Sequence, residues 1–115
     1  MTTAVTTQAA ELPITRARTQ LQRAAVHAHL TFAEHKDELA DLRPSFWSSL
    51  ADFRYAFDEP DPDAELEEAF KLGYKRWGAP GDFGYGTPCG EALRQLYNAW
   101  NIYAEARNDR ESSAA

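Results

Sequence analysis

The stretch LQRAAVHAHLTFAEHKDELADL, Leu21–Leu42, has the clearest apolar period in the 115-residue chain. Its spacing predicts a first helix from about Thr15 to Leu42 that packs along another helix, and Pro44 ends it because proline disfavours helical geometry in the preceding residue. Within it, TFAE at Thr31–Glu34 has the pattern of a capping box, so a break near Thr31 is an alternative. The recurring positions alternate in steps of four and three: Leu21, Ala25, Ala28, Phe32, His35, Leu39 and Leu42.

Three further helices are predicted after the first. One begins near Ser45, although FRYAF at residues 53–57 also alternates in the manner of a strand. The other two each begin with a capping residue followed by proline, at Asp61–Pro62 and at Thr87–Pro88. The predicted buried positions of these helices are Phe46, Leu50, Phe53, Phe57, then Leu66, Phe70, Gly73, Trp77, and then Leu93, Leu96, Tyr97, Trp100 and Tyr103 or Ala104.

The sequence therefore predicts an all-α fold, a small bundle of four to five helices with a glycine-rich loop before the last helix. Residues 14–107 form the single helical domain, between a disordered leader at 1–13 and a disordered tail at 108–115. An unbroken first helix would be ~42 Å long against ~21–24 Å for each of the next two. A break at Thr31, end-to-end stacking of the two short helices, or a homodimer through the first helix would cover the excess.

Charge and composition favour some classes of protein over others. The net charge is −6, and residues 34–68 alone carry −9, which argues against direct nucleic-acid binding because phosphate contacts need clustered Lys and Arg. One cysteine excludes an internal disulfide, and no apolar run is long enough for a membrane span or typical of a secretory signal. We expect a cytoplasmic protein without a membrane role. Twenty alanines and nine arginines against three lysines indicate a GC-rich prokaryotic or phage genome.

No metal or cofactor is expected from the residue pattern. The acidic run at 58–68 resembles a calcium loop in charge alone, because Pro60 and Pro62 interrupt it and its sixth position lacks glycine. His35 and Glu38 share a helix face, but this pair occurs once and has the wrong order for a di-iron bundle. His35 is interpreted as a hydrogen-bonded residue at the edge of the core.

The segment GAPGDFGYGTPCG, residues 78–90, holds five of the six glycines and presents two aromatic rings between them. The sequence leaves open whether these rings face the core or the solvent. Our first hypothesis is a small regulatory protein without catalysis that binds a protein partner through aromatic residues and an acidic ridge. The predicted partner-binding residues are Tyr74, Trp77, Phe83 and Tyr85, with Asp58, Glu59, Asp61 and Asp63.

Two alternatives remain at this point. In the first, the acidic face mimics nucleic acid and inhibits a nucleic-acid-binding protein. In the second, Cys89 supports thiol chemistry or small-ligand binding with the glycine-rich loop as a lid, because amide groups at the start of the last helix would lower the pKa of its thiol.

Overall fold

The computed structural model describes the backbone of residues 2–39 and 41–114 and the side chains of residues 13–39 and 41–108. This part of the chain is helical without a strand, so the all-α prediction is confirmed and the strand alternative for residues 53–57 is wrong. The elements are α1 (Thr2–Glu34), the 3₁₀ helix η1 (Lys36–Leu39), α2 (Pro44–Tyr55), the 3₁₀ helix η2 (Ala56–Asp58), α3 (Pro62–Trp77), the 3₁₀ helix η3 (Pro80–Phe83) and α4 (Pro88–Ala114).

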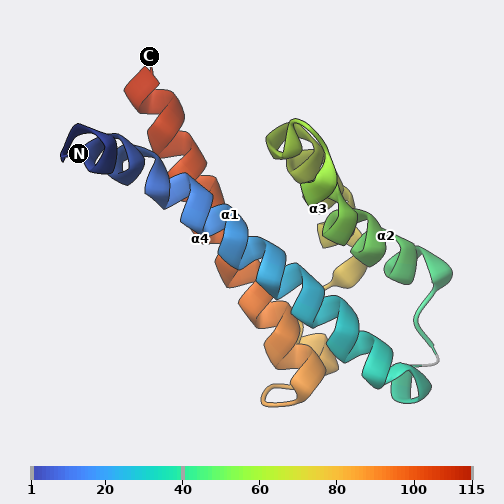
Figure 1. The fold of residues 1–115 in the computed structure, drawn as a ribbon. Helices are drawn as coiled ribbons and strands as arrows, with labels where there is room; N and C mark the ends of the chain where they lie inside the picture. Colours follow the sequence, from blue (N-terminus) through green and yellow to red (C-terminus); the bar gives the residue numbers. More distant parts are fainter. Residues whose placement is uncertain (1, 40, 115) are drawn as a thin grey trace.

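The two long helices, α1 and α4, run antiparallel along each other, and α2 and α3 lie to one side of them (Figure 1). Both ends of the chain lie at the same end of this pair (Figure 1). The two helices are similar in length, with 33 residues in α1 and 27 in α4. Helix α4 therefore packs along most of α1, beyond the reach of the two short helices. The length of α1 therefore requires neither a break nor a second copy of the chain.

Helix α1 continues through Thr31 and ends at Glu34, eight residues before the predicted Leu42. The backbone N–H of His35 still donates to the carbonyl of Thr31 at 3.3 Å, so the capping-box pattern does not start a new helix here. Residues 36–39 then form η1, which carries the chain away from α1 toward α2. At its other end, α1 begins at Thr2 and contains Pro13. The prediction that residues 1–13 and 108–115 are disordered is not tested, because most of their side chains lie outside the described residues.

The starts of α3 and α4 follow the predicted proline pattern, and Pro44, which was predicted to end the first helix, also begins α2. Pro44, Pro62 and Pro88 each occupy the first turn of their helix, where the missing N–H costs no hydrogen bond. The Thr87 hydroxyl accepts the N–H of Gly90 at 3.2 Å and so caps α4, whereas the Asp61 side chain makes no capping hydrogen bond to α3.

The core lies between the α1–α4 pair and the α2–α3 pair, and large rings fill it. Phe70 of α3 stacks on Trp100 of α4 with 4.1 Å between ring centroids, and Phe53 of α2 packs edge-on against both Trp77 and Trp100. The Trp77 ring nitrogen donates to the Ser49 hydroxyl at 3.0 Å, so this buried polar group has a partner. All twelve firm predictions of buried positions on the last three helices lie in or against the core, including Gly73, which touches the Trp77 ring.

Close backbone packing explains two glycines of the connection between α3 and α4. Gly84 has φ of +92°, a conformation that favours glycine, and its carbonyl accepts the Thr87 hydroxyl at 2.7 Å. A Cβ atom on Gly90 would lie 2.2 Å from the Gly84 carbonyl oxygen, so the first turn of α4 can pack on η3 only without a side chain there. The glycines thus serve the packing of the connection.

Candidate functional site

The aromatic residues predicted to bind a partner divide between the core and the surface. Trp77 is 1% exposed, and Phe83 packs edge-on against Phe32 at 5.0 Å between centroids. Trp77 therefore belongs to the core, where it contacts Phe53 and Ser49 of α2, which corrects its assignment to a contact surface. Phe83 is half-buried and packs against the core. Tyr74 and Tyr85 remain exposed, at 58% and 85%.

Most of the aromatic side chains in the described part of the chain lie in or against the core. A chain of ring contacts joins residues of α2, α3 and α4 across the core. A second group at the η3 end, which includes a ring from α1, contains Phe32, Phe46, Trp47 and Phe83. Of the rings in or against the core, Trp47 and Phe83 are the two that lie outside the predicted buried positions.

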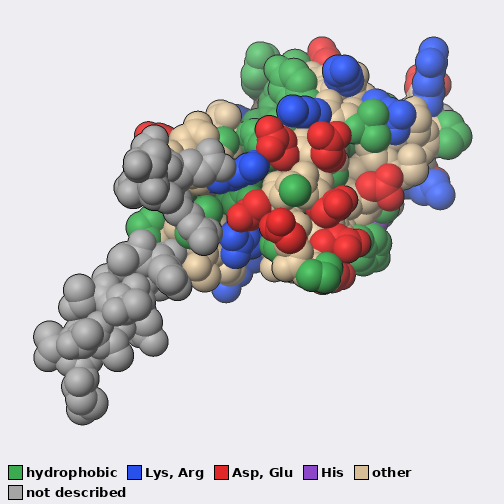
Figure 2. Space-filling model, turned by 90° about the horizontal axis from the view of Figure 1, so that it is seen from above, with side chains coloured by type: hydrophobic (Ala, Val, Ile, Leu, Met, Phe, Trp, Pro, Cys, Tyr) green, Lys and Arg blue, Asp and Glu red, His purple; other side chains and the backbone are tan. Residues whose placement is uncertain are grey.

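Acidic side chains gather on the face of the molecule formed by the end of α2, η2 and the first half of α3. Figure 2 shows Asp and Glu side chains close together over this face. We define the acidic face as the exposed residues Asp52, Asp58, Glu59, Asp61, Glu65 and Glu68. Within residues 13–39 and 41–108, none of these six carboxylates makes an ion pair or a side-chain hydrogen bond. Their charge is therefore left for solvent or for another molecule.

Asp63 belongs to the same acidic run but has a different role. Its carboxylate accepts hydrogen bonds from the Arg18 guanidinium, at 3.0 Å for the shortest, and from the Tyr103 hydroxyl, which ties the start of α3 to α1 and α4. Burial opposes the charge of Asp63, but the hydrogen bonds from Tyr103 and Arg18 and the charges of Arg18 and Arg107 outweigh it, so the pKa of the Asp63 carboxyl is lowered. This corrects the assignment of Asp63 to the partner surface.

Tyr55 is an exposed aromatic residue of the acidic face that the sequence analysis did not select. It ends α2 and is 56% exposed, and the Arg54 guanidinium lies 5.4 Å from its ring centroid. Asp52 precedes it by three residues, one turn earlier on α2, and Asp58 and Glu59 follow it in η2 and directly after it. The exposure of Tyr55 could have been predicted from the sequence. The buried positions Phe46, Leu50 and Phe53 define the inner face of α2, and position 55 lies outside that face.

Cys89 does not have the environment predicted for a reactive thiol. It is 6% exposed in the second position of α4, against the core. Burial and the nearby charge of Glu38 raise the pKa of the Cys89 thiol, opposite to the predicted lowering by the start of the helix. Desolvation thus dominates over the helix dipole at this position.

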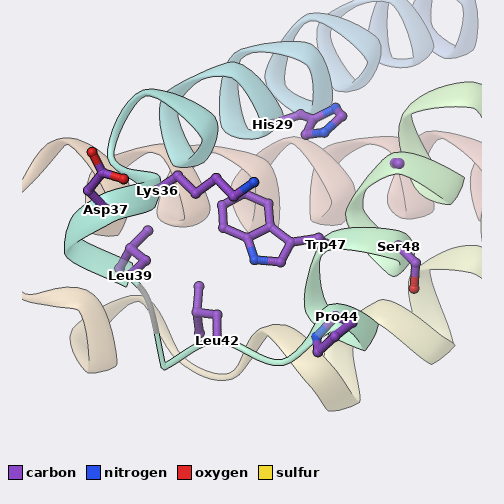
Figure 3. Close-up of a pocket in the computed structure, with 9 residues that line it drawn as sticks. His29, Lys36, Asp37, Leu39, Leu42, Pro44, Trp47 and Ser48 are labelled. Atoms are coloured by element: carbon purple, nitrogen blue, oxygen red, sulfur yellow. The ribbon is translucent and has the colours of Figure 1, made fainter.

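A separate cavity of about 830 Å³ opens between the end of α1, η1 and the start of α2 (Figure 3). Its wall is largely apolar, and the Trp47 ring from α2 reaches across it (Figure 3). Polar groups enter from His29 of α1 and from Lys36 and Asp37 of η1. No motif in the sequence had indicated this cavity, because its lining residues come from three elements.

Neither a metal site nor a membrane-spanning element is found in the described part of the chain. His35 Nδ1 lies 3.2 Å from a carboxylate oxygen of Glu38, the hydrogen-bonded arrangement predicted for it. Across the described residues, no three His, Cys, Asp or Glu side chains gather in a way that could hold a metal ion. The helices in that same part are not long and apolar enough to cross a membrane.

Comparison with known proteins gave no relative on which to base a function. No protein-family model matches the chain, and no curated protein and no solved structure is significantly similar to it. The geometry of the acidic face and of the Trp47 cavity therefore carries the functional argument alone.

Proposed function

We propose that this protein is a non-catalytic binding module that docks a basic protein partner on its acidic face, with Tyr55 as the anchor of the contact. The observations that carry the proposal are the six exposed carboxylates of the acidic face, which have no intramolecular partner among the described residues, and the exposed ring of Tyr55 at the end of α2. Other acids, such as Glu67, Glu91 and Asp63, are paired with cations of their own chain.

The two components of this surface would act at different stages of binding. The carboxylates attract a basic partner over a distance of about a Debye length and raise the association rate. The Tyr55 ring contributes apolar area at low conformational cost and slows dissociation once it is covered. Tyr85 is more exposed than Tyr55, but the carboxylate of Asp82, three residues before it, already accepts the N–H of Ala79 at 3.0 Å.

The test uses capture of partners from the source lysate by wild-type protein, Tyr55→Ala and the matched control Tyr85→Ala, followed by mass spectrometry. We expect a basic protein that wild type and Y85A retain and Y55A loses. With that protein purified, Y55A should weaken binding about tenfold or more. Neutralisation of Asp58, Glu59 and Asp61 to the corresponding amides should lower mainly the association rate and its dependence on salt.

Two results would contradict the proposal: equal capture of the same proteins by wild type and Y55A, or an affinity that does not change between low and high salt. Competition with duplex DNA then distinguishes two kinds of basic partner. Displacement of the protein by DNA would identify the partner as a nucleic-acid-binding protein and the acidic face as a mimic of phosphate charge. Binding that DNA leaves unchanged would identify a docking contact outside the partner's nucleic-acid site.

A further inference from the structure

The lining of the cavity at Trp47 divides into an apolar wall and a polar rim. The wall consists of Leu39, Leu42, Pro44, Trp47 and Ala51. A volume of about 830 Å³ lies in the range of sites that hold small molecules, which are also mostly apolar with a few polar groups. The cavity shares no lining residue with the acidic face.

His29 supplies a neutral hydrogen-bond donor at the rim. The Arg54 Nη1 lies 3.2 Å from His29 Nδ1, and because a guanidinium only donates, Nδ1 must be the acceptor. The proton of the neutral ring is therefore on Nε2, the nitrogen that Arg54 does not engage, and His29 is one of the residues that line the cavity. Burial and the Arg54 charge lower the pKa of the His29 imidazole, which keeps the ring in this neutral form at pH 7.

Lys36 supplies the positive charge. Its side chain extends across the cavity toward the Trp47 ring, whereas the Asp37 carboxylate points away from the ring (Figure 3). Among the described residues no carboxylate pairs with Lys36. The Ser48 hydroxyl, at the other side, is engaged with the Ser45 carbonyl at 3.3 Å. The groups available near the ring are thus a cationic donor and a neutral donor.

From this arrangement we infer that the cavity binds a small aromatic carboxylate, with its ring against Trp47 and its carboxylate between Lys36 Nζ and His29 Nε2. An anion receives charge-assisted hydrogen bonds from both donors, and a flat ring matches the apolar wall. A cationic ligand would meet Lys36 and the Arg54 that supports His29. A purely aliphatic ligand would leave both donors without an acceptor.

The test is a titration of the full chain with indole-3-acetate, followed by amide chemical shifts in NMR spectra, with the neutral indole-3-acetamide as the matched ligand. We expect shifts concentrated in residues 29–51 and at least fivefold weaker binding of the amide. Lys36→Gln should weaken acetate binding about fivefold and leave amide binding unchanged. Lys75→Gln, on the exposed surface of α3, should change neither.

Trp47→Ala should weaken both ligands about tenfold, and Trp47→Phe, which keeps a ring, should restore most of the binding. The inference is overturned if indole-3-acetate causes no localised shifts up to about 5 mM, a limit that corresponds to very weak binding. Equal affinity for the acid and the amide, or an unchanged affinity in K36Q, overturns the assignment of an anion. A tripeptide ending in phenylalanine that binds tenfold more tightly than indole-3-acetate would replace the small molecule by a chain end.

Discussion

The connection between α2 and α3 and the connection between α3 and α4 have the same plan and different surroundings. Each contains a short 3₁₀ helix and two aromatic residues separated by one position, Tyr55 and Phe57 in the first and Phe83 and Tyr85 in the second. In both, the phenylalanine packs on the core and the tyrosine is exposed. Asp58 and Glu59, which make no ion pair among the described residues, closely follow the first tyrosine in the sequence, whereas Asp82, near the second, accepts the N–H of Ala79.

This comparison shows that an exposed ring is not by itself a functional site. The phenylalanine fixes each connection to the core, and the nearby polar groups then determine what the outward ring can do. In the α3–α4 connection, the Asp82 carboxylate and the Thr87 hydroxyl satisfy backbone groups of the connection itself. In the α2–α3 connection, the carboxylates of Asp58 and Glu59 are exposed and make no ion pair within the described part of the chain, so that connection has charge available for a partner.

The largest expected effect is a difference in the free energy of unfolding between variants of Phe83 and Tyr85, the two rings of the α3–α4 connection. Phe83→Ala should lower the free energy of unfolding by about 3 kcal/mol, because it leaves space beside Phe32 and Phe46. Tyr85→Ala should change it by less than about 0.5 kcal/mol, since the ring is 85% exposed. Urea unfolding followed by circular dichroism measures both. Equal losses in the two variants would show that the inward and outward roles are assigned wrongly.

The next effect separates two acids of the α2–α3 region. Asp63→Asn should cost about 1–3 kcal/mol at pH 7, because it removes the charge that Arg18 and Tyr103 stabilise. Asp58→Asn, the matched control on the acidic face, should be nearly neutral. Urea unfolding at a series of pH values measures the two variants against wild type.

The pH dependence of this difference has a definite sign. The folded-state pKa of Asp63 is lowered, so its contribution is complete above the unfolded value of ~3.9 and is lost as the pH falls through the folded value. The gap in stability between wild type and D63N should therefore close below about pH 4. A gap that stays constant into acid would exclude the charged Asp63 contact as its source.

The smallest effect concerns Cys89, just after the α3–α4 connection, and is a rate rather than a change in stability. Its raised pKa and burial predict slow alkylation by iodoacetamide, with a midpoint above the ordinary thiol value of 9.0. Mass spectrometry of samples quenched at different pH values measures the rate, with the unfolded chain in guanidinium as the reference. Fast reaction at neutral pH in the folded state would restore the thiol hypothesis.

Local sequence rules predicted the helices well. Proline at the first turn, a capping threonine and the four-three apolar spacing act within a few residues of each other, and they place the starts of α2, α3 and α4 and their buried faces. Those rules failed at Thr31, where a capping pattern lies inside a helix. There the buried Thr31 and Phe32 pack on the core, and burial outweighs the weak local preference for a new helix start.

The candidate sites were predictable only in part. The acidic run at residues 58–68 could be predicted because charge is a property of composition. Five of its seven acids are exposed in the structure, as is Asp52. The different role of Asp63 within that run could not be predicted from the sequence. Its hydrogen-bond donors, Arg18 and Tyr103, lie far from it along the chain. The Trp47 cavity was missed for the same reason, because its donors and its wall meet only when η1 folds beside α2.

The sequence by itself determined the all-α class, the helical starts and the acidic charge of residues 34–68, because each depends on neighbours along the chain. Only the tertiary structure decided that α4 covers α1, that Phe83 turns inward while Tyr85 turns outward, and which carboxylates are free. These properties depend on which side chains pack together across the core and exclude water from each other. The residues that pack together are far apart in the sequence, so no local pattern predicts the contact.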